Sequence, residues 1–220
     1  MPIVTRRDFV AAAVALPLAG ELIVRGSTGK KQGTWEHVSG REGMRRHFFP
    51  SVTLTTHKGK KVRFYEDVLK GKIVVLNLMY ADCTAYCPVI TQRLLTAQRI
   101  LLETRGFRPG RDYFFYSITV KPEEDTPGKL TEFAEMHKVG EGWTFLTGKP
   151  DDIELVRRKL GFADPDPVVD RDKSRHSGMI RYGNEPRCWW GACQSSADPE
   201  WIAKEISFAF PVETKKTKRA

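Results

Sequence analysis

Two cysteines four positions apart are the residues of this sequence whose type and spacing most clearly suggest chemistry. Cys83 and Cys87 stand in the segment DCTAYCP, directly after an apolar run and directly before Pro88. Residues at i and i+4 of a helical turn face the same way, with β-carbons about 5–6 Å apart. Thiols in that arrangement can hold one metal ion, or they can close a disulfide that is strained and readily reduced.

A helix that begins at this pair would make the thiols reactive. A helix N-terminus stabilises a thiolate, which lowers the thiol pKa and produces a nucleophile and metal ligand at neutral pH. Pro88 is compatible with such a helix start. Two structural alternatives remain, namely buried unpaired cysteines that fill space and a purely structural disulfide. A position between a strand end and a helix fits both of them poorly.

Two thiolates leave a metal ion under-coordinated, so a metal site needs a third ligand. The candidates are the five histidines of the chain, His37, His47, His57, His137 and His176. His176 stands out because it follows a long polar loop, residues 163–175, and immediately precedes a short predicted strand. Sequence spacing alone does not bring His176 near the cysteines.

The hydrophobic pattern predicts the elements that position the pair. The apolar run Ile73–Tyr80 is typical of a buried strand, and helical periodicity follows over Pro88–Arg105 until Gly106. The ligands of mainly parallel sheets bind at the carboxyl ends of strands. The first cysteine lies just past such an end.

The rest of the chain alternates between strand and helix patterns, which predicts an α/β fold with mainly parallel central strands. A hairpin with Gly59 in its turn is expected first. The other expected strands are residues 113–120, 143–146 and 179–182, and the other expected helices begin near Thr126, Ile153 and Pro199.

The first 25 residues resemble a bacterial twin-arginine export signal. Arg6 and Arg7 precede the apolar stretch Phe9–Gly20, which is short for a membrane span of ~20 residues. Small residues suited to cleavage match only weakly, so an uncleaved leader that acts as a membrane anchor stays open. Export predicts a periplasmic protein. The predicted organisation is a leader at 1–25, a polar linker at 26–47, a folded domain at 48–210 and a basic tail at 211–220.

Composition favours a folded domain and disfavours nucleic-acid binding. Hydrophobic residues make up 40% of the 220 residues and aromatic residues 10%, which is enough for a packed core. The net charge is +9, but the positive residues are scattered and form no stripe interleaved with aromatic side chains.

Four segments together resemble the Sco/SenC family over roughly Phe49–Tyr182. They are DCTAYCP (82–88), YSITVKPEEDTP (116–127), FLTG (145–148) and DKSRHS (172–177). The resemblance implies a thioredoxin-like fold with an N-terminal β-hairpin and an insertion before the last strands. It also implies that His176 faces Cys83 and Cys87 and completes a metal site. Two soft thiolates and one imidazole suit copper, copper(I) especially and copper(II) with a completed shell, whereas zinc prefers a fourth ligand.

The function implied by the resemblance is that of a copper metallochaperone, which assists assembly of the binuclear copper site of cytochrome c oxidase. Its partner would be the copper-bearing subunit or another copper or thiol carrier. One alternative is a thiol–disulfide reductase for the copper-ligand cysteines of the oxidase, with Cys83 and Cys87 catalytic and His176 dispensable. A peroxidase of the peroxiredoxin kind matches only partly, through Thr84 relative to Cys87. A binding module with two structural disulfides is the fourth possibility.

The sequence departs from the family pattern in three places. Lys121 stands where the family often has Asp, and it could lower a thiol pKa or simply be solvated. Residues 84–86 replace the acidic or polar spacer of many relatives. Cys188 and Cys193 lie outside the pattern. An even cysteine count in an exported chain predicts a local disulfide between them, with a relay to the first pair or a second copper site as alternatives.

Overall fold

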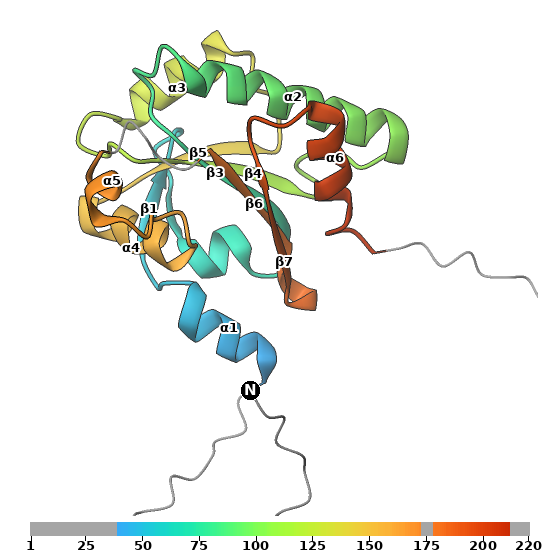
Figure 1. Cartoon of the computed structure of the whole chain (residues 1–220), viewed down its shortest axis with the longest axis horizontal. Coiled ribbons are helices and arrows are strands. Elements are labelled where there is room, and N and C mark those ends of the chain that lie inside the picture. The colour runs from blue at the N-terminus through green and yellow to red at the C-terminus, as the bar shows by residue number, and fades with distance from the viewer. Residues whose placement is uncertain (1–38, 173–177, 212–220) are drawn as a thin grey trace, which may run out of the picture. The chain divides into compact units, whose positions relative to one another are not determined.

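A mixed β-sheet of seven strands forms the centre of the part of the chain that the computed structural model describes, residues 39–172 and 178–211 (Figure 1). The strands are β1 (Thr53–Thr56), β2 (Lys61–Arg63), β3 (Ile73–Met79), β4 (Phe114–Thr119), β5 (Trp143–Thr147), β6 (Met179–Asn184) and β7 (Trp189–Gln194). Their order in the sheet is β2-β1-β5-β4-β3-β6-β7.

Helices connect these strands. They are α1 (Gly40–Phe48), the π-helix η1 (Phe64–Leu69), α2 (Tyr86–Arg105), α3 (Pro127–Met136), α4 (Pro150–Lys159), α5 (Pro167–Arg171), the 3₁₀-helix η3 (Glu185–Arg187) and α6 (Pro199–Ser207). Within residues 39–172 and 178–211, no helix combines the length and the apolar character that crossing a membrane requires.

The three central strands are parallel, as the alternating pattern predicts. β3 pairs with β4 and β4 pairs with β5 in parallel register. The hairpin β1–β2 joins the sheet antiparallel to β5, and β6 and β7 extend it antiparallel beyond β3. The carboxyl ends of β3, β4 and β5 therefore share one edge of the sheet, where the loops that follow these strands meet.

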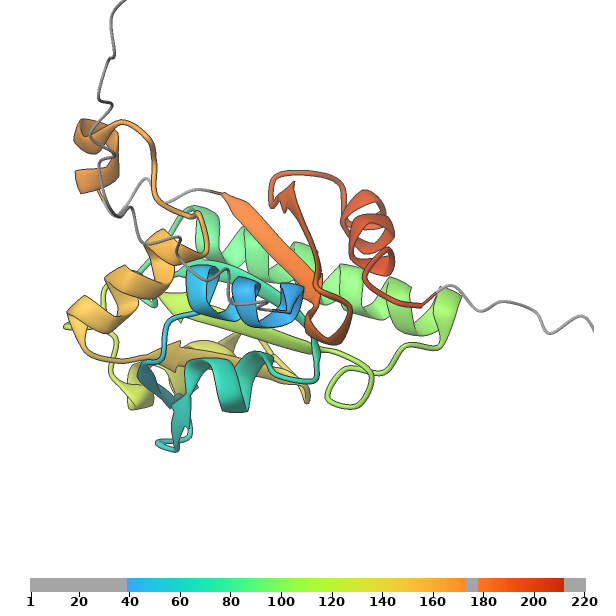
Figure 2. The ribbon, with the colours of Figure 1, turned by 90° about the horizontal axis from the view of Figure 1, so that it is seen from below.

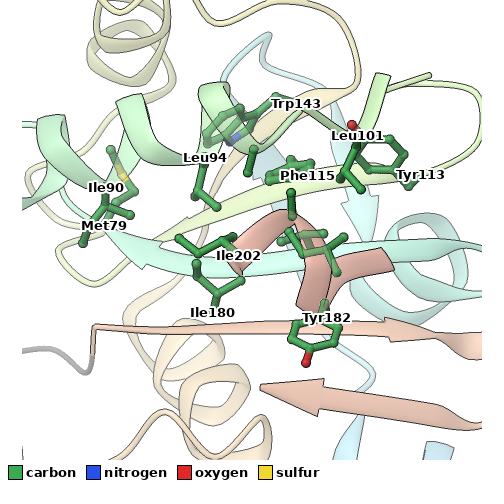
Figure 3. Close-up of a cluster of buried hydrophobic side chains, with 14 of the residues drawn as sticks. Met79, Ile90, Leu94, Leu101, Tyr113, Phe115, Trp143, Ile180, Tyr182 and Ile202 are labelled. Atoms are coloured by element: carbon green, nitrogen blue, oxygen red, sulfur yellow. The ribbon is translucent and has the colours of Figure 1, made fainter. Parts of the chain in front are cut away.

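Side chains of the central strands alternate between two apolar layers. Val75 and Phe115 point into the layer under α2, α3 and α6, whereas Val74 and Tyr116 point into the layer under η1 and α4. Figures 1 and 2 show helices on both faces of the sheet, and Figure 3 shows Leu94 packed into the first layer. Burial of each large apolar side chain contributes about 1.5–3 kcal/mol, which holds α2 firmly on the strands.

Helix signals in the sequence match the structure closely at two ends. α2 ends where Gly106 adopts a left-handed conformation, with φ of 68°. α3 begins after Thr126, whose hydroxyl accepts a hydrogen bond from the Lys129 amide, and Pro127 occupies the first turn.

Two stretches predicted to be irregular contain helices. Residues 40–48, which fall mostly in the predicted linker, form α1, and Ser39 caps that helix. α1 has no fully buried residue, and Met44 alone in this helix packs against the second apolar layer, so its apolar pattern is too weak to predict a helix. α5 lies within the predicted polar loop 163–175, where the buried Arg157–Asp170 ion pair ties it to α4.

The predicted disulfide between Cys188 and Cys193 is wrong, because all four thiols are free. Cys188 directly precedes the extended strand β7 and Cys193 lies near the end of that strand. Five residues of extended chain at ~3.3 Å each separate the two by about 16 Å, whereas bridged α-carbons lie within about 7 Å.

Candidate metal and thiol site

The cysteine pair occupies the predicted position, between the carboxyl end of β3 and the start of α2. Cys83 lies in the loop that joins these elements, and Cys87 is the second residue of α2. Both side chains are buried, with exposed fractions of 5% for Cys83 and 1% for Cys87. Cys83 is therefore the thiol with the greater access to solvent.

The sulfur of Cys83 caps helix α2. Ala85 occupies the N-cap position and offers no side-chain acceptor to the first free amides of the helix. The amide of Cys87 instead donates a hydrogen bond to the Cys83 Sγ at 3.2 Å. Because the helix N-terminus carries partial positive charge, this position favours a thiolate at Cys83.

Burial and hydrogen bonding act in opposite directions on Cys83. Burial raises the pKa of its thiol, but the amide and thiol of Cys87, the Tyr80 hydroxyl and the Ala85 amide all donate hydrogen bonds to the sulfur. These donors prevail and lower the pKa of Cys83 to about 7. The hydrogen bond to Cys83, followed by burial, raises the pKa of Tyr80 to about 12, so this hydroxyl keeps its proton at neutral pH.

Cys87 behaves in the opposite way. Burial, followed by the hydrogen bond to Cys83, raises the pKa of the Cys87 thiol to about 12. At neutral pH the pair therefore consists of a partly ionised sulfur that accepts a hydrogen bond and a protonated sulfur that donates it. This arrangement supplies one ready nucleophile or ligand and one thiol that must lose a proton before it can act.

Two side chains from the segment after β4 support the loop before Cys83. Asp125 is 1% exposed, and both of its carboxylate oxygens accept from the Ala81 amide, at 3.2 and 3.1 Å. Lys129 forms an ion pair of 3.0 Å with Asp82. The sequence gives no sign of these contacts, which join residues more than 40 positions apart.

Lys121 contacts Tyr80, the hydrogen-bond partner of Cys83. The Lys121 ammonium lies 4.8 Å from the centre of the Tyr80 ring and 3.3 Å from a carboxylate oxygen of Glu124. The Lys121 ammonium therefore packs against the Tyr80 ring, and the Glu124 carboxylate partly balances its charge.

The proposed third ligand, His176, lies outside the described residues. On the described side, the antiparallel register pairs Asn77 of β3 with Ile180 of β6. Extended by two positions, this register places Gly178 opposite Met79, the last residue of β3. The loop that carries Cys83 follows Met79 directly. Within residues 39–172 and 178–211, no group of three His, Cys, Asp or Glu side chains is placed to hold a metal ion.

The two cysteines of the second pair lie in different surroundings. Cys193 is buried in the same apolar layer as α2, and burial, followed by the charge of Glu205, raises its pKa to about 12. Cys188 is partly exposed at the end of η3, with φ of 52°.

Comparison with known proteins gives one consistent result. The family model described as SCO1/SenC matches residues 41–207. The SCO1 protein homolog of Bacillus subtilis (strain 168) is 29% identical over 97 residues, which are 44% of this chain and 47% of that protein. The match therefore spans about half the length of this curated relative.

Solved structures share the fold. Yeast Sco1 with copper bound is 19% identical, with a TM-score of 0.57 over 76% of this chain and 98% of that one. BsSco, described as a member of the Sco family of cytochrome c oxidase assembly proteins, is 22% identical, with a TM-score of 0.56 over 72% and 90%. The expected thioredoxin-like α/β fold is thus confirmed.

Proposed function

Because this chain belongs to the SCO1/SenC family, we propose that it is a copper-binding metallochaperone that assists assembly of the binuclear copper site of cytochrome c oxidase. The paired thiols at the start of α2 carry the proposal. Their soft sulfur donors fit copper(I), and copper-bound yeast Sco1 has the same fold. The partner in this proposal is the copper-bearing subunit of the oxidase or another copper or thiol carrier.

In this proposal Cys83, Cys87 and His176 hold copper as cargo. Cys83 supplies a sulfur that is already about half ionised at neutral pH, because its pKa is about 7. Cys87 must release a proton, because its pKa is about 12 in the metal-free protein. Copper binding then releases protons, so the apparent copper affinity falls as the pH falls. His176 enters as third ligand by the family resemblance.

The difference in pKa between the two thiols also favours a second candidate, a thiol–disulfide reductase. The Cys83 thiolate would attack one sulfur of a target disulfide, and the other target sulfur would leave as a thiolate. Cys87, once deprotonated, would then attack Cys83 and release the second target thiolate. The target gains two electrons while Cys83 and Cys87 become a disulfide, and His176 takes no part.

The two remaining possibilities find less support. A peroxidase that attacks through Cys87 would need an ionised and accessible sulfur, but this thiol is buried and protonated at neutral pH. A module with two structural disulfides conflicts with four free thiols.

Copper titration of the reduced protein tests the proposal. We expect one copper per chain and a thiolate-to-copper(II) absorption band that Cys83→Ser, Cys87→Ser and His176→Ala each abolish or strongly weaken. Cys188→Ser is the matched control, because it removes a thiol outside the site, and it should leave the band unchanged. Reduced wild-type protein that takes up no copper would refute the proposal.

His176→Ala separates the two candidates. A metallochaperone should lose oxidase maturation with this substitution. A reductase should keep its activity while binding no copper, and that result would favour the second candidate.

The proposed location is the periplasm. The twin-arginine-like leader supports export, and an uncleaved leader would keep the copper site close to the membrane in which the oxidase is assembled. A Lys substitution of both Arg6 and Arg7 should retain the protein in the cytoplasm, as fractionation would show.

A further inference from the structure

The carboxylate that supports the cysteine loop is buried close to the thiol pair. Asp125 directly precedes the N-cap of α3 and is 1% exposed. Its two oxygens accept from the Ala81 amide, and the Thr119 hydroxyl donates to one of them. Asp125 thereby connects the end of β4 to the loop after β3.

Burying the Asp125 carboxylate is energetically unfavourable unless other groups compensate its charge. Among the described residues, no Lys or Arg lies within ion-pair distance of Asp125, and burial raises its pKa. Burying an unpaired charge costs several kcal/mol unless hydrogen bonds compensate. Here the Ala81 amide and the Thr119 hydroxyl provide that compensation, so their geometry is strongly constrained.

The anchored residue lies only two positions before Cys83. The short loop from Ala81 to Ala85 determines where the Cys83 sulfur meets the Cys87 amide. Lys129, in the first turn of α3, also holds Asp82 in this loop, but that ion pair is largely exposed and contributes little. Of these two side-chain contacts, the buried one made by Asp125 therefore constrains the loop more.

We propose that Asp125 is a positioning residue for the thiol pair: by fixing Ala81, its carboxylate holds the Cys83 sulfur against the N-terminus of α2. The proposal rests on the proposed function only in taking Cys83 as the reactive thiol. It predicts that loss of this anchor weakens every reaction that depends on the position of the Cys83 sulfur.

The test is the rate at which iodoacetamide alkylates Cys83 in reduced, copper-free protein at one fixed pH, with peptide mapping to identify the site. Asp125→Ala should slow Cys83 about tenfold or more. Asp125→Asn should recover most of the rate, because its side-chain oxygen can still accept from the Ala81 amide. Alkylation of Cys188 in the same samples should be unchanged.

Glu185→Gln is the matched control. Glu185 is also a buried carboxylate that accepts from a backbone amide, that of Gly71 at 2.7 Å. It lies at the opposite end of β3, beyond the pairing of Ile73 with Asn184. Its substitution should lower stability but leave the Cys83 rate at the wild-type value.

Two results would overturn the proposal. One is an Asp125→Ala protein whose Cys83 reacts at the wild-type rate. The other needs no variant: amide hydrogen exchange of Ala81 in the wild-type protein as fast as in an unstructured peptide would show that the anchor is absent. Neither measurement involves copper, so failure of the metallochaperone proposal would leave both outcomes interpretable.

Discussion

Cys83 and Cys87 have the same side chain but opposite ionisation behaviour. The Cys83 sulfur accepts hydrogen bonds at the N-terminus of α2, whereas the Cys87 thiol is buried in the apolar layer and donates a hydrogen bond to Cys83. Spacing alone predicts that two thiols meet. It does not predict which of them ionises, because that depends on donors such as the Tyr80 hydroxyl.

Tyr80→Phe should therefore reduce the reactivity of Cys83. In the wild-type protein, the alkylation rate of Cys83 should rise with pH around a midpoint near 7, where its pKa lies. Loss of a hydrogen bond to a charged sulfur costs about 1.5–3 kcal/mol, so the midpoint should shift upward by about one to two pH units. Rates measured over a pH series, with Cys83 identified by mass spectrometry, check this.

Tyr86→Phe is the control for that series. Tyr86 lies between the two cysteines but is 72% exposed, and it donates no hydrogen bond to Cys83 among the contacts that lower the Cys83 pKa. Its substitution should leave the midpoint near 7. Equal midpoints for wild-type protein and Tyr80→Phe would contradict the assigned role of the hydroxyl.

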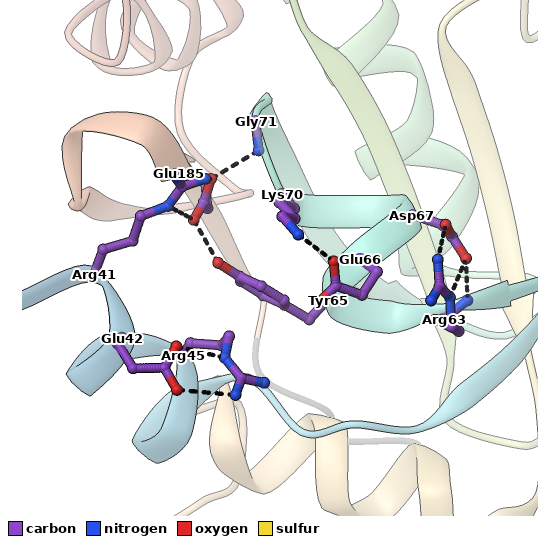
Figure 4. A network of polar contacts seen from close by, with 10 residues as sticks. All are labelled: Arg41, Glu42, Arg45, Arg63, Tyr65, Glu66, Asp67, Lys70, Gly71 and Glu185. Carbon is purple, nitrogen blue, oxygen red and sulfur yellow. Dashed lines mark hydrogen bonds and ion pairs between the residues drawn. The ribbon is translucent and has the colours of Figure 1, made fainter. Parts of the chain in front are cut away.

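Polar contacts connect helix α1 to its neighbouring elements (Figure 4). Arg41 donates two hydrogen bonds of 2.6 Å to Glu185, which also accepts from the Tyr65 hydroxyl at 2.7 Å and from the Gly71 amide. One buried carboxylate thus connects α1, η1 and η3. Although burial opposes ionisation, these donors prevail and lower the pKa of Glu185.

Arg41→Ala should loosen α1 without disturbing the thiols. Arg41 is 44% exposed and Glu185 keeps two other donors, so we expect a loss of about 1–2 kcal/mol in unfolding free energy. Denaturant unfolding measures this loss, and limited proteolysis between α1 and β1 should become faster. Arg46→Ala, which removes an exposed pair within α1, should change stability far less.

The contribution of Glu185 also has a defined pH dependence. A carboxyl group whose pKa is lowered by folding stabilises the protein above its unfolded-state pKa, near 4.3, and this stabilisation is lost as the pH falls further. Wild-type protein should therefore lose more stability than Arg41→Ala as the pH falls below about 4. Parallel stability curves for the two proteins would contradict the assignment.

Elements with a regular apolar pattern could be predicted from the sequence. β3, α2 and the first hairpin follow from apolar periodicity and glycine positions, and the structure confirms them. α1 and α5 depend on ion pairs, and β7 has an exposure pattern with a single buried residue, Cys193. α1 and α5 carry no strong apolar signal because ion pairs with other elements stabilise them, and β7 is held by its pairing with β6.

Sheet topology brings the parts of the site together. Because β3 and β4 are parallel, the cysteine loop and Asp125 follow strand ends on the same side of the sheet. The antiparallel strand β6 begins on that side too. The sequence predicts the thiol pair and its strand-end position correctly. Tyr80 and Asp125 could not be predicted, because their partners are fixed only by folding, and His176 stays a prediction.

X-ray absorption spectroscopy of the copper(I)-loaded protein identifies the atoms that bind the metal. The ligand set proposed here predicts two sulfur scatterers and one imidazole nitrogen around each copper ion. In His176→Ala the imidazole contribution should disappear while the sulfur contribution remains. A wild-type spectrum with sulfur ligands alone, or an imidazole signal that persists in His176→Ala, would rule out His176 as the third ligand.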